Sequence, residues 1–173
     1  MTELNIRNRI ETPGDEPAIR AVNLAAFATA TEADLVDQLR RDLDILTSLV
    51  ADTPEGKIVG SLVLSSVVVE EQGERVCAAL APVSVHPVWQ RQGIGTRLIK
   101  SGLVALERQK VELVFVLGDP QYYERFGFSI ELAQPFRSPF SGPAFQVLRL
   151  LGNSSHESGG ALGYAPAFQN SAS

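Results

Sequence analysis

The chain has 173 residues, of which 45% are hydrophobic and 20% charged, a composition typical of a soluble globular protein that excludes a disordered or fibrous one. This length suits one domain with a continuous core and is too short for two domains of ordinary size. The net charge of −5 disfavours nucleic acid as a partner, because most of the surface would repel its phosphates.

Neither a membrane helix nor a signal peptide is indicated, because no long uninterrupted apolar window occurs and the N-terminal stretch lacks a basic region followed by an apolar one. We therefore expect no membrane partner. Cys77 is the single cysteine, which excludes an intramolecular disulfide and favours the cytoplasm. His86 and His156 do not form a metal-ligand spacing with that cysteine, so no metal is expected. A homodimer is left open.

The N-terminal third predicts a strand followed by two helices. Alternating apolar residues indicate the strand: Leu4, Ile6 and Ile10. Thr12 and Asp15 have the spacing of a capping box and Pro13 suits a first helical position, so a helix is expected from Thr12 through Phe27. A second start signal at Thr31 opens another amphipathic helix.

The middle of the chain predicts an antiparallel hairpin and a central strand. Two β-branched runs, 48–51 and 58–69, flank a turn sequence at 52–56. The nearly uncharged run 76–85 is long enough for a central strand and would bury Cys77 in the core. Pro82 removes one ladder hydrogen bond from this strand, which predicts a bulge or a splay.

The last third continues the mixed α/β order. We expect helices at 93–109 and 120–125 and strands at 113–117, 128–132 and 145–150. Beyond Gly152 the chain contains several Gly and Ser and no Lys or Arg, which predicts an irregular tail. Its apolar cluster of Leu162, Tyr164 and Phe168 is a candidate for docking on the body.

The segment between the central strand and the following helix has the properties of a phosphate site. Gly93 and Gly95 lack the Cβ atoms that would keep a phosphate from the main chain, and they open a helix whose first N–H groups are available. Five bases and one acid give the segment 90–110 a charge of +4 within a chain of −5: Arg91, Arg97, Lys100, Arg108 and Lys110 against Glu107. This concentration of positive charge suits a polyanion such as CoA or a nucleotide.

Two common phosphate motifs do not fit these residues. No P-loop pattern occurs in the chain, and a dinucleotide fingerprint would need its third glycine at Leu98. A nucleotide-binding protein unrelated to acyl transfer stays open on these grounds alone.

The segment Gln90-Arg91-Gln92-Gly93-Ile94-Gly95 resembles the Q/R-x-x-G-x-G/A pyrophosphate motif of the GNAT superfamily of N-acetyltransferases. A second landmark, Tyr123 to Phe128, resembles the Y-x-x-x-G-F motif that follows it in that family. The resemblance spans about Asn5 to Leu150. Within the superfamily, the chain is most similar to the YhbS-type acetyltransferases. It implies a GNAT-like fold, with a mostly antiparallel mixed sheet splayed between its fourth and fifth strands and flanked by helices. It also divides the chain into an N-acetyltransferase domain, 1–151, and the tail, 152–173.

The resemblance implies acetyl-CoA as the cosubstrate, with the pantetheine arm bound along 83–85 like an added strand. The implied contacts are Val83, Ser84, Val85, Gln90, Arg91, Gln92, Gly93, Ile94, Gly95, Thr96, Gly118 and Tyr123. Tyr123 is the implied proton donor to the CoA sulfur, although a phenol of pKa ~10 is a weaker acid than a thiol of pKa ~8.5. It would need coupled transfer, a lowered pKa or a role limited to hydrogen bonding.

Other candidate groups are weaker. Tyr122 would point elsewhere on a helix and is assigned to packing. His86 is the titratable side chain nearest the central strand, but a histidine before Pro87 more often caps the loop than acts as a base. The central strand lacks the Glu that many family members place there, which leaves the general base and the charge preference of the substrate open. The second helix carries three acids, Glu32, Asp34 and Asp37. The preferred interpretation is that they form a solvated face, and the alternative is that they attract a cationic amine.

The leading hypothesis is therefore direct transfer of acetyl from acetyl-CoA to the primary amine of a small molecule or peptide, within a ternary complex. The alternative is a non-catalytic acyl-CoA-binding or regulatory module that keeps the loop without turnover.

Overall fold

The structure is a computed structural model that describes residues 5–70, 75–152 and 159–170. Its core is a mixed sheet in the order β1-β2-β3-β4-β5-β7. These strands span Arg7–Ile10, Ile45–Asp52, Ile58–Val69, Cys77–Val85, Leu113–Leu117 and Phe145–Arg149. The β4–β5 pair is parallel, and the other neighbours in this order are antiparallel. The predicted hairpin and central strand are confirmed; Leu4 of the predicted first strand lies outside the described residues.

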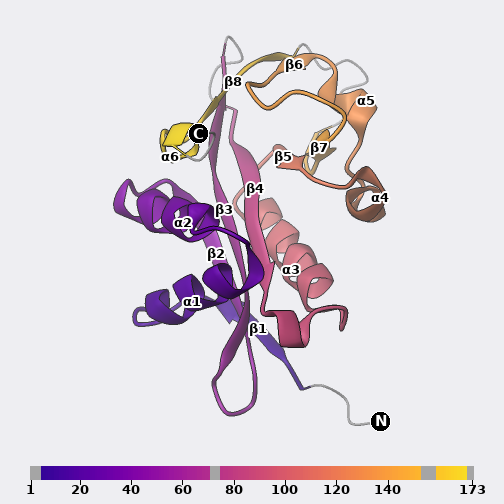
Figure 1. Cartoon of the computed structure of the whole chain (residues 1–173). Helices are drawn as coiled ribbons and strands as arrows, with labels where there is room; N and C mark the ends of the chain where they lie inside the picture. Colours follow the sequence, from indigo (N-terminus) through magenta and orange to yellow (C-terminus); the bar gives the residue numbers. More distant parts are fainter. Residues whose placement is uncertain (1–4, 71–74, 153–158, 171–173) are drawn as a thin grey trace.

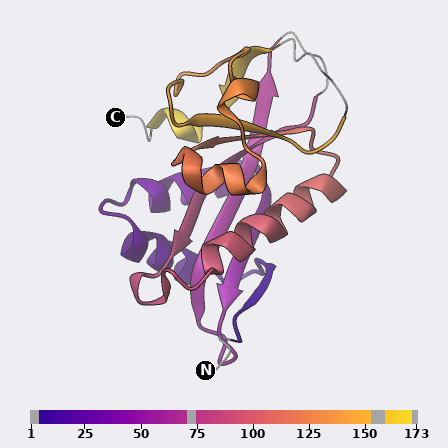
Figure 2. The ribbon, with the colours of Figure 1, turned by 90° about the vertical axis from the view of Figure 1, so that its right-hand side faces the viewer.

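Helices cover both faces of this sheet. On one face lie α1 (Glu16–Ala26) and α2 (Thr31–Arg41), which bury Ile19 and Leu39 completely (Figure 1). On the other lies α3 (Ile94–Arg108), whose Leu98 and Ile99 are also fully buried (Figure 2). The apolar stripe of each helix faces the sheet, so the sheet separates two hydrophobic cores. Within the described ranges, no helix is long and apolar enough to cross a membrane.

Two predictions of secondary structure are wrong because side chains form other hydrogen bonds than those expected: the start of the first helix and the strand at 128–132. Thr12 does not cap α1, which begins at Glu16; instead the Asp15 carboxylate accepts hydrogen bonds from the Thr12 backbone N–H at 2.8 Å and from Arg9 at 2.7 Å. The predicted strand 128–132 is replaced by the short helix α5 (Ile130–Ala133). Ser129 makes one isolated bridge to Val147 and then caps that helix by accepting from the Leu132 N–H at 3.2 Å.

Residues 160–164 and 167–170 form regular structure where we expected an irregular tail. Strand β8 (Gly160–Tyr164) pairs antiparallel with β3 and parallel with the two-residue β6 (Phe136–Arg137), and the helix α6 (Ala167–Asn170) follows. The prediction failed because β2 begins at Ile45, opposite Ser65, which leaves the last residues of β3 available for another strand. The docking of Leu162, Tyr164 and Phe168 on the body is confirmed.

Candidate functional site

The loop between β4 and α3 is held in shape by three side chains. His86 Nδ1 accepts from the Val88 N–H at 3.3 Å and caps the 3-10 turn Pro87–Trp89, as predicted. Gln90 Nε2 donates to the Val85 carbonyl at 2.9 Å, and Gln92 Nε2 donates to the Val88 carbonyl at 3.4 Å. These contacts fix the course of the loop before it reaches the helix.

Helix α3 begins with exposed backbone donors. Its first intrahelical bond runs from the Arg97 N–H to the Gly93 carbonyl at 3.0 Å, so the N–H groups of Ile94, Gly95 and Thr96 have no acceptor within the helix. Gly93 adopts φ +79°, a left-handed conformation that glycine takes at little cost. Arg91 has φ +61°, which is uncommon for a residue with a side chain. The loop therefore turns its amides outward as an anion site.

A cleft of about 480 Å³ lies over these amides, and we call it the phosphate cleft. Seven predicted cofactor residues line it: Val85, Gln90, Arg91, Gly93, Ile94, Gly95 and Thr96. Gln92 lies outside the lining, where it braces the loop. A Cβ added at Gly95 would stand 3.5 Å from Tyr122 Oη and 3.8 Å from Val85 Cγ2, which are ordinary contacts. The fold itself therefore does not require glycine at this position.

Strands β4 and β5 diverge beside the cleft. Their parallel pairing runs from Cys77–Leu113 to Leu80–Val116 and ends there, while β4 continues along β3 as far as Val85. The register of β3 and β4 shifts between Leu62 and Leu64, opposite the segment that contains Pro82. The predicted interruption at this proline is confirmed, and the β5-facing edge of 81–85 is left without a partner strand.

The side chains of the predicted pantetheine segment alternate across the sheet. Val83 and Val85 pack on the α3 side, and Ser84 points to the opposite face by strand alternation. Ser84 is 3% exposed, and its Oγ finds no hydrogen-bond partner in the described part of the chain. The segment therefore offers backbone rather than side-chain donors to a ligand on the α3 side.

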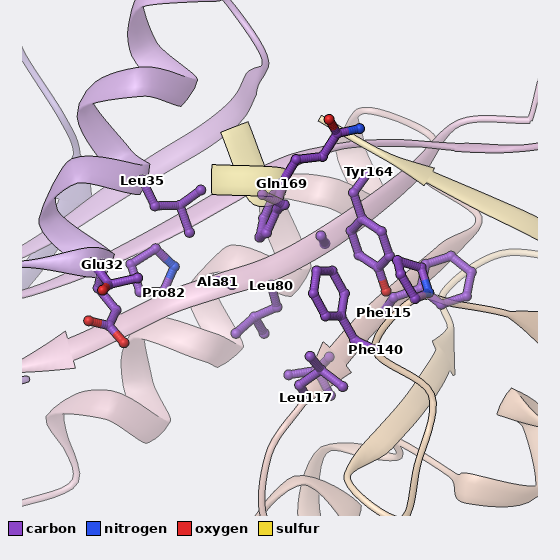
Figure 3. Close-up of a pocket in the computed structure, with 15 residues that line it drawn as sticks. Glu32, Leu35, Leu80, Ala81, Pro82, Phe115, Leu117, Phe140, Tyr164 and Gln169 are labelled. Carbon is purple, nitrogen blue, oxygen red and sulfur yellow. The ribbon is translucent and has the colours of Figure 1, made fainter. Parts of the chain in front are cut away.

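A second cavity, of about 810 Å³, opens on the α2 side of the same strands (Figure 3). Its floor is formed by 79–82 of β4 and 115–117 of β5, the points at which the two strands separate. Its walls come from α2, β8, α6 and the segment before β7, and include Glu32, Leu35, Phe140, Tyr164 and Phe168. We call it the apolar cavity. It and the phosphate cleft lie on opposite faces of the sheet and share β4.

A family model described as an acetyltransferase (GNAT) domain matches residues 8–130. The chain belongs to this GNAT acetyltransferase family. The YhbS N-acetyltransferase of Escherichia coli K12, itself uncharacterised, is 37% identical over 145 residues, which are 82% of this chain and 86% of that protein. As a GNAT member, the chain is an acyl-CoA-dependent acetyltransferase, and the predicted family and fold are confirmed.

Two solved GNAT structures match almost the whole chain. The crystal structure of E. coli YhbS in complex with CoA has a TM-score of 0.89 at 33% identity, and covers 96% of this chain and 93% of its own. A GNAT acetyltransferase from Brucella melitensis in complex with acetyl-CoA has a TM-score of 0.79 at 32% identity, with coverages of 95% and 99%.

The two tyrosines of the second GNAT motif are placed differently. Tyr123, at the end of α4 (Pro120–Tyr123), is 7% exposed and packs against Gly118 and Phe128. Burial, with a smaller contribution from Tyr122, raises the pKa of Tyr123 to about 12. This direction favours coupled transfer or hydrogen bonding over a lowered pKa for this phenol.

Tyr122 packs against the core on the α3 side, as predicted, and it also lines the phosphate cleft. Its Oη lies 3.4 Å from Thr96 Oγ1, and the Arg125 guanidinium stacks 4.3 Å from the centre of its ring. Arg125 also lines the cleft and brings a cation that sequence reasoning missed. The i, i+3 spacing of Tyr122 and Arg125 was the available signal, because residues three apart share a helical face.

Of the remaining candidates, one lies in the core, two lie on α2 outside both cavities, and one lines the apolar cavity. Cys77 is 1% exposed within the core, as predicted. Asp34 and Asp37 pair with Arg20 at 2.8 and 2.6 Å on the outer side of α2, whereas Glu32 lines the apolar cavity. No group of three metal-ligating side chains occurs among the described residues, and His156 lies outside them.

Proposed function

We propose that this chain transfers the acetyl group of acetyl-CoA directly to a primary amine, with both substrates bound at once. The observation that carries the proposal is the pair of cavities on opposite faces of the sheet. The phosphate cleft ends at Val85, and the apolar cavity begins at Pro82 on the same strand. Three residues of strand rise about 10 Å, so one extended ligand arm would link the two.

The cofactor would be held mainly by backbone groups. The N–H groups of Ile94, Gly95 and Thr96 point toward a pyrophosphate in the cleft, with the side chains of Arg91 and Arg125 adding charge. The unpaired edge of β4 at 83–85 would accept the pantetheine arm as an added strand. Gln90 and Gln92 act as positioning residues, because their side chains bond to the loop backbone.

In the transfer step, the neutral amine nitrogen attacks the thioester carbonyl carbon. The C–N bond forms as the C–S bond breaks, the electron pair of that bond leaves with sulfur, and the one proton that the nitrogen loses passes to solvent water. Gly118 directly follows β5 and contacts the ring of Tyr123, which sets that ring beside the point where β4 and β5 have separated. Because its pKa is about 12, well above a thiol near ~8.5, Tyr123 would stabilise the thiolate by donating a hydrogen bond and would keep its proton.

Calorimetry and steady-state kinetics test the proposal. The protein should bind CoA, release thiol from acetyl-CoA when an amine is present, and give intersecting double-reciprocal plots, because ping-pong kinetics would require an acyl-enzyme. Tyr123→Phe should lower kcat about tenfold or more without changing the Kd for CoA. Tyr122→Phe is the matched control and should instead weaken CoA binding. CoA binding without thiol release on any amine would favour the non-catalytic module, and parallel plots would refute direct transfer.

A further inference from the structure

The apolar cavity has the chemistry of a site for one positive charge attached to an apolar body. Aromatic rings form much of one end: Phe115, Phe140 and Tyr164 (Figure 3), with Phe168 packed against Tyr164. Phe140 and Tyr164 stack edge to face with ring centres 5.2 Å apart, and the Tyr164 Oη lies 3.1 Å from Ser138 Oγ. The tyrosine hydroxyl already has a partner, so this end presents mainly carbon.

Glu32 is the acid of this cavity. It projects from the first turn of α2 beside Pro82, away from the aromatic end (Figure 3). Its Oε2 atom is inaccessible to solvent and has no hydrogen-bond partner among the described residues. Arg20 of α1 pairs with the other two acids of α2, Asp34 and Asp37. A buried carboxylate oxygen without a partner is costly, and a cation or donor supplied by a ligand would remove that cost.

The same cavity disfavours a second charge on the acceptor. Among the described residues that line it, none is Lys, Arg or His, so the carboxylate of an amino acid would find no cation and would face Glu32. A second ammonium group would have to enter the aromatic end, where the lining offers no further acid.

We propose, on the basis of the proposed acetyl transfer, that the acceptor is a small monoamine with an aromatic or alkyl body and that Glu32 binds its ammonium group. Glu32 and Pro82 both line the cavity, and its floor lies where β4 and β5 separate. The nitrogen bound at Glu32 therefore stands beside the opening through which the thioester arrives. The body of the amine packs against Phe140 and Tyr164.

The substrate prediction is tested with amines that carry one, two or three charged groups. 2-Phenylethylamine should be acetylated with a kcat/KM at least tenfold higher than phenylalanine, which adds a carboxylate, and than lysine, which carries three charges. Hexylamine should resemble 2-phenylethylamine. A preference for phenylalanine, lysine or a lysine peptide would overturn the proposal while leaving acetyl transfer itself intact.

The role of Glu32 is tested with Glu32→Gln, which keeps the shape and removes the charge. This variant should raise the KM for 2-phenylethylamine at least tenfold and leave the Kd for CoA unchanged. Its Tm should stay the same or rise, because Oε2 of Glu32 has no hydrogen-bond partner among the described residues to lose. Asp34→Asn is the matched control from the same helix and should change neither constant. An unchanged KM in Glu32→Gln would refute the role of this carboxylate.

A binding measurement separates this proposal from the proposed function. 2-Phenylethylamine titrated into CoA-saturated protein should bind to the parent and bind at least tenfold more weakly to Glu32→Gln, whether or not acetyl is transferred. Binding without turnover would reject the enzyme mechanism and keep the amine site. Turnover of other amines without binding of this one would do the opposite.

Discussion

Gly118 controls the position of the Tyr123 ring. Replacing this glycine by alanine tests how tightly the ring packs against it. An added Cβ would overlap Cε2 of Tyr123 and stand 2.9 Å from its Cδ2. The ring has little room to move, because Phe128 and Tyr122 pack edge-on against it with ring centres 5.6 and 5.0 Å away. Overpacking of this kind costs about 1–3 kcal/mol, and each kcal/mol lowers the Tm of a chain of this size by about 2–4 °C.

The assay is a double-mutant cycle read by chemical denaturation and by kinetics. Gly118→Ala should destabilise the parent by about 1–3 kcal/mol but cost little in a Tyr123→Ala background, where the ring is absent. In the parent it should also lower kcat, since the displaced phenol would not reach the CoA sulfur as the proposed mechanism requires. Gly163→Ala is the matched control, because its Cβ would lie 3.7 Å from that of Val68, an ordinary contact. An equal cost in both backgrounds would refute the proposed packing.

Three further predictions concern the cleft and the N-terminal ion pairs. Gly95→Ala should leave the Tm unchanged and weaken CoA binding about tenfold, or ~1.4 kcal/mol, by calorimetry, because the methyl group fits the protein and obstructs a phosphate; unchanged affinity would contradict this. Arg125→Gln should raise the Kd for CoA, and the ratio to the parent should shrink at high salt; a salt-independent ratio would argue against a charge role. Hydrogen bonds from Arg7, then Arg9, lower the pKa of Asp52, so the stability from these bonds is complete above the unfolded pKa, near ~3.9, and lost as pH falls toward the folded value. In urea denaturation, the free energy of unfolding should fall less between pH 6 and pH 3 in Asp52→Asn than in the parent. Equal falls in the two proteins would contradict this role of Asp52.

The elements set by local pattern were predictable. The apolar stripe of α3, the turn sequence of the β2–β3 hairpin and the interruption at Pro82 each act over a few residues, and each matches the structure. The phosphate cleft was predictable for the same reason, because its donors come from one continuous loop. Seven of the predicted residues accordingly line it.

The misassigned or missed parts depend on partners distant in sequence. Ser129 ends its strand after one bridge because its side chain caps the next turn, and β8 exists because β3 extends beyond β2. Tyr122 lines the cleft next to Thr96, with which its hydroxyl pairs and which lies 26 positions earlier in the sequence. The apolar cavity is formed by α2 together with the C-terminal segment, which is distant in sequence. No local pattern therefore predicts that Glu32 lies in a cavity.

The two cavities draw on different parts of the chain. The family model ends at residue 130, whereas Phe140, Tyr164 and Phe168 of the apolar cavity all follow it. Every residue that lines the phosphate cleft lies within the family model, so the proposed acceptor site depends on C-terminal residues that the proposed cofactor site does not use. Grafting these C-terminal residues between YhbS-type relatives would be a direct route to new amine selectivity.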